Sequence, residues 1–267
     1  MKYITKLKNI IRKNKSNIVV GLDSEISKIP LFFLKYKNPV LEFNKRIIDA
    51  TKESSAGYKI NTAFYEAEGA FGFSTLEETV KYIPDNLIKI CDAKRGDIGN
   101  TAEMYAKAFF ENMDFDAIAV NPYMGKDAVE PFLKRKDKFV YILAHTSNKG
   151  AEDFQKLITN RKPLFINIIE KSLEWNKNNN IGFVIGANHT KLIKEISSRK
   201  PEIPLLIPGI GAQGNDLEIL QKNLFNKIYI INSSRGIIYS SPKNTNEKKF
   251  IAVITESLKE LNYGFKL

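Results

Sequence analysis

A carboxylate, an ammonium group and a second carboxylate stand within six residues in the segment Asp92-Ala93-Lys94-Arg95-Gly96-Asp97. The segment directly follows a short apolar run, 87–91, which has the length and composition of a buried strand. Side chains two residues apart on a strand share a face, so Asp92 and Lys94 would point the same way, with Asp97 in the loop beyond. Charges packed so closely cost desolvation energy unless each is paired, which favours a chemical role. The alternative is a solvated loop whose charges alternate in sign.

Polar residues also follow several other apolar runs of the chain. Any one of them could cap the next helix, but barrels of alternating strands and helices place their active sites at this end of the strands. Together these ends predict a site that is assembled from several strands. The residues concerned are Asp23, Lys59 and Asn61, Asn121, and His145-Thr146-Ser147.

Two glycine-containing loops late in the chain predict a phosphate site. The first reads Pro208-Gly209-Ile210-Gly211-Ala212-Gln213-Gly214 and the second reads Ser233-Ser234-Arg235-Gly236. They would follow the seventh and eighth strands, and barrels often bind a phosphate between these two loops through backbone amides. Arg235 would add a charge-assisted contact. Tight turns also need glycine, so the pairing of the two loops carries the prediction rather than either loop alone.

Eight short β-branched runs alternate with longer amphipathic segments. The runs lie at 17–23, 56–61, 87–92, 116–121, 139–145, 181–188, 204–208 and 227–232, and helix-like segments between them lie at 43–53, 75–82, 101–112, 127–133, 166–178, 191–198 and 215–224. This alternation predicts a parallel sheet, and eight units in 267 residues predict an α/β protein with one (β/α)8 TIM barrel domain over residues 1–267. A doubly wound open sheet is the alternative, but the first strand ends Gly21-Leu22-Asp23-Ser24 and lacks a glycine-rich dinucleotide loop.

The N-terminal segment, Met1–Asn17, is basic and places Ile4, Leu7, Ile10 and Ile11 on one helical face. It lacks the continuous apolar stretch of a secretory signal. It loosely resembles a transit peptide but has no enrichment in serine and arginine. We expect a short helix that covers one end of the barrel before the first strand.

Composition limits the classes of partner. The net charge is +11, but the lysines are scattered, and the tight clusters at 134–136 and 248–249 have no interleaved aromatic residues for base stacking. We interpret the charge as solvated surface and expect neither a nucleic acid nor a membrane partner. The single cysteine, Cys91, excludes an intrachain disulfide and fits a reducing cytoplasm. The two histidines, His145 and His189, show no ligand spacing, so we expect no metal site.

The chemistry-bearing residues resemble the pattern of the orotidine 5′-phosphate decarboxylase family. Asp92, Lys94 and Asp97 match its Asp-x-Lys-x-x-Asp signature, and the resemblance extends from about residue 21 to residue 239. The further matches are Lys59 to the family's upstream lysine, Asp23 to its first-strand aspartate, and Gln213 and Arg235 to its phosphate-contacting pair.

The resemblance is closest to one bacterial subgroup. The subgroup shares the patterns Gly21-Leu22-Asp23, Thr146-Ser147-Asn148 and 208–214. A proline usually follows the first aspartate there, where this chain has Ser24. We expect this difference to alter the loop more than the chemistry.

The resemblance implies an enzyme that converts orotidine 5′-phosphate to uridine 5′-phosphate (UMP) in de novo pyrimidine synthesis, with no metal or organic cofactor. The implied catalytic residues are Lys94, Asp92, Asp97 and Lys59. Lys94 would stabilise the carbanion at C6 and then protonate it, while Asp92 and Asp97 hold its ammonium group in place. Lys59 would orient Asp92 and contact the ribose.

The resemblance also implies the substrate-binding residues. Asp23 would accept hydrogen bonds from the ribose hydroxyls, and either Thr146 or Ser147 would contact the pyrimidine. Asp97, Ile98 and Thr101 would reach into the neighbouring subunit's site, which implies a homodimer with shared active sites. The other implied substrate-binding residues are Asn61, Pro208, Gly211, Gln213, Gly214, Arg235 and Gly236.

Three competing functions remain open from the sequence. Hexulose-phosphate synthase has the same barrel and a similar Asp-x-Lys motif, but it would need a divalent metal. A polyanion-binding protein would use the net charge of +11, and its affinity would fall steeply with salt. A purely structural barrel would leave the polar strand ends unexplained.

Overall fold

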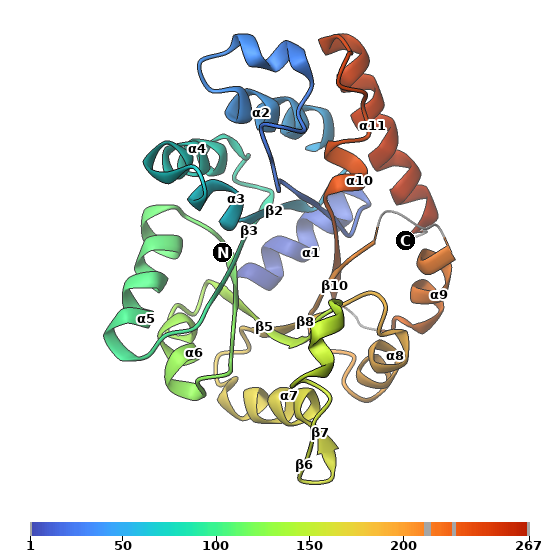
Figure 1. Ribbon diagram of the computed structural model, residues 1–267. Helices are drawn as coiled ribbons and strands as arrows, with labels where there is room; N and C mark the ends of the chain where they lie inside the picture. The colour runs from blue at the N-terminus through green and yellow to red at the C-terminus, as the bar shows by residue number, and fades with distance from the viewer. Residues whose placement is uncertain (1, 211–214, 226–227, 266–267) are drawn as a thin grey trace.

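Eight parallel strands close into a barrel surrounded by helices in the computed structural model, which describes residues 2–210, 215–225 and 228–265 (Figure 1). The order around the ring is β1-β10-β9-β8-β5-β4-β3-β2, and β1 closes the ring by pairing with β10. This closure confirms the predicted (β/α)8 barrel and shows that the open-sheet alternative is wrong. The strands are β1 Ile18–Gly21, β2 Gly57–Asn61, β3 Ile88–Arg95, β4 Ala117–Val120, β5 Phe139–His145, β8 Ile181–Ile185, β9 Leu205–Pro208 and β10 Tyr229–Ser233.

Every predicted helical segment corresponds to a helix of the outer ring. These helices are α2 Pro39–Thr51, α4 Gly69–Tyr82, α5 Gly99–Ala106 with the π-helical turn η2 Lys107–Asn112, α6 Lys126–Leu133, α7 Leu164–Trp175, α8 Thr190–Arg199 and α9 Asn215–Asn223.

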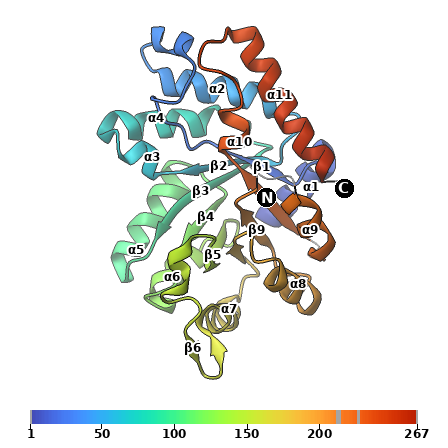
Figure 2. The same ribbon diagram turned by 45° about the vertical axis from the view of Figure 1, so that its right-hand side comes forward.

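Several elements were not predicted, most of them too short for a periodic pattern to show. The unpredicted elements are the 3-10 helices η1 Leu31–Lys35 and η3 Lys149–Glu152, the helices α3 Ala63–Glu66, α10 Arg235–Ile238 and α11 Glu247–Gly264, and an antiparallel hairpin of β6 Ile158–Thr159 and β7 Lys162–Pro163. The long helix α11 lies beside α2 (Figures 1 and 2), where Arg46 pairs with Glu247. Asn246 caps α11 by accepting a hydrogen bond from the Lys249 N–H at 2.9 Å.

The predicted N-terminal helix is present as α1, Tyr3–Asn14, and it covers the amino-terminal end of the barrel. Tyr3 stacks on Phe139 with ring centroids 4.6 Å apart, and its hydroxyl lies 3.0 Å from that of Tyr141. Leu7 and Ile10 are buried in the core. The apolar face predicted for this segment therefore seals one mouth of the barrel, which leaves the other mouth for a site.

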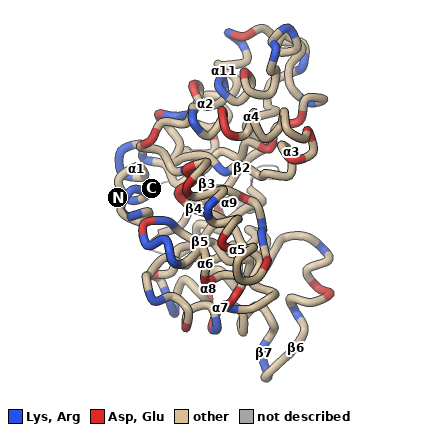
Figure 3. The backbone as a smooth tube through the Cα atoms, turned by 90° about the vertical axis from the view of Figure 1, so that its left-hand side faces the viewer, with Lys and Arg blue, Asp and Glu red and all other residues tan. Residues whose placement is uncertain are grey.

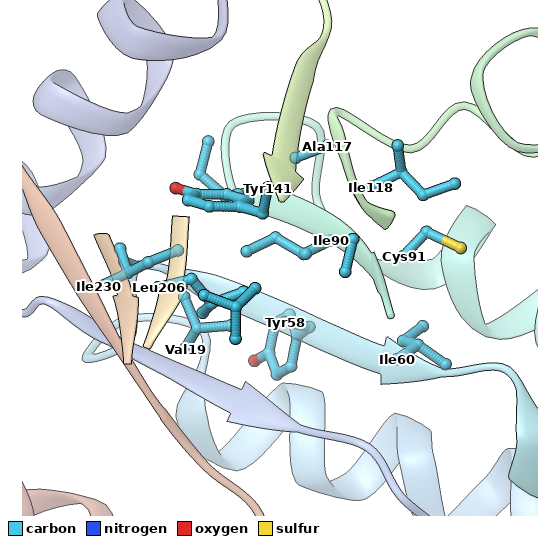
Figure 4. Close-up of a cluster of buried hydrophobic side chains, with 14 of the residues drawn as sticks. Val19, Tyr58, Ile60, Ile90, Cys91, Ala117, Ile118, Tyr141, Leu206 and Ile230 are labelled. Atoms are coloured by element: carbon cyan, nitrogen blue, oxygen red, sulfur yellow. The ribbon is translucent and has the colours of Figure 1, made fainter. Parts of the chain in front are cut away.

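Apolar side chains from several strands fill the barrel interior. Figure 4 shows Val19 of β1, Ile90 of β3, Leu206 of β9 and Ile230 of β10 close together, and all four are buried. Because alternate residues of a strand share a face, Asp92 lies beyond Ile90 on the interior side of β3. The packed interior thus forms the floor under the polar strand ends.

The surface carries acidic and basic residues interspersed, as the face in Figure 3 shows. Many of them pair locally, for example Lys6 with Asp116 at 2.7 Å and Lys81 with Glu77 at 2.8 Å. Within the described ranges, no helix has the length and apolar character needed to cross a bilayer.

Candidate active site

Three of the predicted charged residues form one connected array at the carboxyl ends of β2 and β3. The Asp92 carboxylate lies between two ammonium groups, with Lys59 Nζ 2.8 Å from Oδ2 and Lys94 Nζ 2.6 Å from Oδ1. Asp23, which follows β1, lies 3.8 Å from Lys59 Nζ. Neighbouring strands place these residues: Gly21 of β1 pairs with Lys59, and Asn61 of β2 pairs with Asp92. The charges alternate in space, so each acid faces a base.

Burial divides the array into a fixed part and an accessible part. The Lys59 side chain is 4% exposed and that of Asp92 is 13% exposed, whereas that of Lys94 is 46% exposed. Burial alone would lower the pKa of Lys59, but the carboxylates of Asp92 and Asp23 outweigh it and raise that pKa above its usual value. Burial alone would raise the pKa of Asp92, but Lys59 and Lys94 outweigh it and lower that pKa. Lys59 and Asp92 are therefore both charged near neutral pH, and the more exposed Lys94 side chain faces the open end.

Asp97, Ile98 and Thr101 lie outside this array. The Asp97 carboxylate accepts the N–H of Ile98 at 2.8 Å, and no ion pair joins it to Lys94 within the described part of the chain. Ile98 and Thr101 are exposed, in the loop after β3 and in the first turn of α5. The predicted interaction between the Asp97 carboxylate and the Lys94 ammonium group is thus not formed within the described part of one chain.

The turn after β5 is held in part by Gln155, a residue without a recognisable sequence motif. Gln155 accepts the Thr146 N–H at 2.9 Å and donates to the Thr146 hydroxyl at 2.8 Å. That hydroxyl donates in turn to Asn148 at 2.6 Å, and His189 Nε2 lies 2.8 Å from the Thr146 carbonyl oxygen. The Ser147 side chain is exposed and makes no hydrogen bond with the described residues. Thr146 is therefore engaged in the fold, whereas the Ser147 hydroxyl is available.

The two histidines lie together behind this turn, although the sequence separates them widely. The ring centroids of His145 and His189 are 3.5 Å apart, and Phe165 packs 4.4 Å from His145. Burial, and secondarily the nearby His189, lower the pKa of His145 to about 4. His145 is therefore neutral near pH 7 and acts in packing.

The two predicted phosphate loops are adjacent, in part outside the described residues. Pro208 at the end of β9 pairs with Asn232 of β10. Arg235 and Gly236 begin α10, and both residues are exposed. A Cβ on Gly21 would lie 2.6 Å from Ser234 Cβ, so only glycine lets β1 approach this loop so closely. Gly211, Gln213 and Gly214 fall in 211–214, outside the described residues.

Further residues fix the loop after β1. The Tyr239 hydroxyl donates to the Asp23 carbonyl at 3.0 Å and accepts the Glu25 N–H at 2.7 Å. Ser24 donates to Asn44 at 2.6 Å, so the residue found where the subgroup has proline ties the loop to α2. These positions carry no chemical motif, and only the folded chain brings them together.

Two other strand ends have local roles in this chain. The Asn61 side chain accepts the Ala63 N–H at 3.2 Å where α3 begins, and the Asn121 side chain accepts the Tyr123 N–H at 3.0 Å. Asn121 therefore holds a turn ahead of α6, which begins only at Lys126, whereas Asn61 lies at the start of α3 and also beside Asp92 in the strand register.

The fold and the charged array define the class of protein: a (β/α)8-barrel enzyme with a candidate active site at the carboxyl ends of the strands. Residues 16–250 match the Orotidine 5′-phosphate decarboxylase / HUMPS family, and the chain belongs to that family.

Relatives named orotidine 5′-phosphate decarboxylase cover most of the chain. The protein of Christiangramia forsetii is 51% identical over 237 residues, which are 86% of this chain and 87% of that one. The protein of Flavobacterium johnsoniae is 49% identical over 236 residues, 86% of each chain. The solved structure of Leishmania donovani OMP decarboxylase is 32% identical, has a TM-score of 0.83, and covers 98% of this chain with 96% of its own. The bacterial relatives agree with the predicted bacterial subgroup.

Proposed function

We propose that this protein removes carbon dioxide from orotidine 5′-phosphate to form UMP, as a cofactor-free step of de novo pyrimidine synthesis. The observation that carries the proposal is the Lys59–Asp92–Lys94 array, which presents one accessible ammonium group at the open mouth of the barrel. The names of its close relatives support the same substrate.

The array suits the chemistry of this decarboxylation. The bond between C6 and the carboxyl carbon breaks, carbon dioxide leaves, and the electron pair stays on C6. Lys94 stabilises that developing charge electrostatically and then transfers a proton from Nζ to C6. Asp92 offers one oxygen as the hydrogen-bond acceptor of this ammonium group, and Lys59 binds the other oxygen of Asp92.

The remaining strand ends hold the substrate. Asp23, Asn61 and Lys59 surround the ribose. Phosphate binding falls to the two late loops, with Arg235 as the cationic partner. In these loops the proposed binding residues are Pro208, Gly211, Gln213, Gly214, Arg235 and Gly236. Binding energy from the phosphate, which is remote from C6, is available to close the site and exclude water.

Of the two residues left open for the pyrimidine, we assign the contact to Ser147. The Thr146 hydroxyl already accepts from Gln155 and donates to Asn148, which uses its single proton. The Ser147 hydroxyl is exposed beside the phosphate loop, 4.0 Å from the position of a Cβ on Gly209. Thr146 then acts by fixing the turn.

The active unit in this proposal is a homodimer of single-domain subunits in the cytoplasm. Asp97, Ile98 and Thr101 complete the neighbour's site, which fits the absence of an Asp97–Lys94 pair within the described chain. Exposed apolar side chains on the same side, Ile98, Met104, Tyr123 and Met124, support a covered surface there. No membrane or nucleic acid partner is needed.

The test is a spectrophotometric assay of orotidine 5′-phosphate with a metal chelator present. We expect turnover that the chelator does not change. Loss of turnover with the chelator, together with aldol activity on a sugar phosphate, would favour hexulose-phosphate synthase instead. Salt-sensitive binding to polyanions without turnover would favour the polyanion-binding function.

A further inference from the structure

The backbone at Lys94 departs from the regular strand. Lys94 has φ of +49°, a left-handed conformation that is uncommon for a residue with a side chain and persists only where the surroundings enforce it. Between the rungs Cys91–Ile118 and Arg95–Val120, β3 contains Asp92, Ala93 and Lys94, whereas β4 contains only Ala119. The strand therefore bulges at the residues that form the array.

Arg95, the next residue, anchors this bulge through its side chain and its main chain. Its Nη1 donates to the Ala93 carbonyl at 3.1 Å, and its Nη2 donates to Glu66 of α3 at 2.5 Å. Its own carbonyl oxygen accepts the Asn121 N–H at 2.8 Å. Lys94 is thus held on both sides, at the carbonyl that precedes it and at the residue that follows it.

Aromatic rings of the next helix complete the anchor. The Arg95 guanidinium lies 5.2 Å from the ring centroid of Tyr105 in α5 and 5.6 Å from that of Phe109 in η2. These are cation–π distances, and a planar guanidinium can stack there while its edges form hydrogen bonds, which an ammonium group cannot do.

The Lys94 side chain depends on this anchor because it has few restraints of its own. It is 46% exposed, and Asp92 is its one ion-pair partner among the described residues. A single exposed ion pair contributes little to fixing a long flexible side chain. The position of Nζ is therefore decided by the backbone from which it extends.

We propose that Arg95 is a positioning residue for Lys94: it enforces the left-handed backbone that places the Lys94 ammonium on Asp92 and toward the substrate. Arg95 does not touch the substrate in this proposal. The catalytic consequence rests on the proposed decarboxylase function, whereas the placement of Lys94 does not.

The principal test compares Arg95→Met with Arg135→Met. Arg135, just after the end of α6, is a matched control because it also combines glutamate pairing, with Glu103 and Glu111, with a hydrogen bond to a backbone carbonyl, that of Pro131. For Arg95→Met we expect kcat to fall at least tenfold, while the Kd for UMP stays within about threefold of wild type. For Arg135→Met we expect lower thermal stability with unchanged kcat. Equal losses of kcat in both variants, or a kcat within threefold of wild type for Arg95→Met, would overturn the proposal.

Two further variants cover the case in which Arg95→Met does not fold. Glu66→Gln removes the charge of the partner but keeps its size, and we expect a smaller fall in kcat with UMP binding retained. Arg95→Lys keeps the positive charge but loses the planar guanidinium that bonds to Ala93 and Glu66 together. We expect its kcat to lie between those of Arg95→Met and wild type. Full activity in both Glu66→Gln and Arg95→Lys would contradict the assigned role.

A crystal structure of Arg95→Met, or of Arg95→Lys where Arg95→Met does not fold, separates this inference from the proposed function. We expect Lys94 to return to negative φ, with Nζ beyond 4 Å from Asp92. An unchanged Lys94 would overturn the inference even if the enzyme decarboxylates orotidine 5′-phosphate. A displaced Lys94 in a protein whose wild type has no such activity would support the inference and refute the function.

Discussion

Asp92 binds one ammonium group with each of its oxygens, Lys59 on Oδ2 and Lys94 on Oδ1. The two side chains differ in exposure, 4% for Lys59 against 46% for Lys94, so Lys59 is held within the array and Lys94 faces the open mouth. Asp23, 3.8 Å from Lys59, supplies the second negative charge, so two carboxylates balance two ammonium groups in the cluster. This balance of charges explains why so polar a cluster is tolerated directly above the apolar interior of the barrel.

Lys94→Ala tests the proposed proton donor. We expect turnover to fall by at least a thousandfold, which corresponds to a barrier increase of about 4 kcal/mol. The variant lacks both the positive charge that stabilises the C6 carbanion and the proton that C6 receives. UMP should still bind, since the phosphate and ribose contacts are untouched. Steady-state kinetics and UMP titration measure both quantities, with Lys81→Ala, an exposed ion-paired lysine on α4, as the control. Turnover within tenfold of wild type would exclude Lys94 as the donor.

The lowered pKa of Asp92 predicts a specific dependence of stability on pH. A carboxyl group whose pKa is lower in the folded state stabilises the protein above its unfolded pKa, about 3.9, and this contribution is lost as pH falls through the folded pKa. The advantage of wild type over Asp92→Asn in free energy of unfolding should therefore be constant from pH 8 to about pH 5 and shrink at lower pH. Urea unfolding at a series of pH values measures it. An advantage that persists undiminished at pH 2 would contradict the assignment.

The elements of the barrel were largely predictable because each repeats a simple pattern. A β-branched run of five to eight residues marked every strand, most of these runs had a polar residue at the end, and amphipathic spacing marked seven helices. The four-residue helices α3 and α10 have no room for such a pattern. Tyr239 bonds to a loop more than 200 residues away, and Gln155 bonds across η3 to Thr146 outside any recognisable motif, so no local pattern identifies either anchor.

The turn after β5 yields a prediction that separates two neighbouring hydroxyl residues. Ser147→Ala should weaken UMP binding by about 0.5–1.5 kcal/mol, the value of one hydrogen bond, without changing the melting temperature. Thr146→Val should lower the melting temperature, because it removes the hydroxyl that accepts from Gln155 Nε2 and donates to Asn148 Oδ1. Calorimetric titration and thermal unfolding of both variants measure this. Weaker UMP binding in Thr146→Val alone, at unchanged melting temperature, would transfer the pyrimidine contact to Thr146.

At the scale of the whole molecule, one end of the barrel is sealed and the other end is open. α1 closes the amino-terminal mouth with Tyr3, Leu7 and Ile10, whereas the carboxyl mouth has exposed apolar residues beside its charged array. The loops after β3 and β4 carry Ile98, Tyr123 and Met124 on that side. A second subunit covering these loops would both bury apolar surface and deliver Asp97.

Mixing two inactive variants tests the shared site. Lys94→Ala and Asp97→Ala should each be nearly inactive as homodimers. When they are unfolded and refolded together, half of the dimers are mixed, and each mixed dimer has one intact site and one site with both defects. Activity should therefore return to about a quarter of wild type by the symmetry of a two-fold dimer. No recovery after subunit exchange has been demonstrated, by native mass spectrometry of a tagged subunit, would show that Asp97 serves its own chain.

The sequence by itself determined the class of fold, the family and the candidate residues, because strand alternation and the Asp-x-Lys-x-x-Asp spacing are local properties of the chain. Strand alternation also predicted that the side chains of Asp92 and Lys94 would point the same way. In the folded chain they form an ion pair, but through a bulge in which Lys94 has φ of +49°. Only the tertiary structure decided which oxygen of Asp92 meets which lysine, that His145 stacks on His189, and that Arg95 anchors the bulge between α3 and α5. Some of these contacts join residues that are distant in sequence, and the meeting of Asp92 with Lys94 depends on one backbone angle. The packing of the closed barrel determines the contacts and the angle, and no local pattern does.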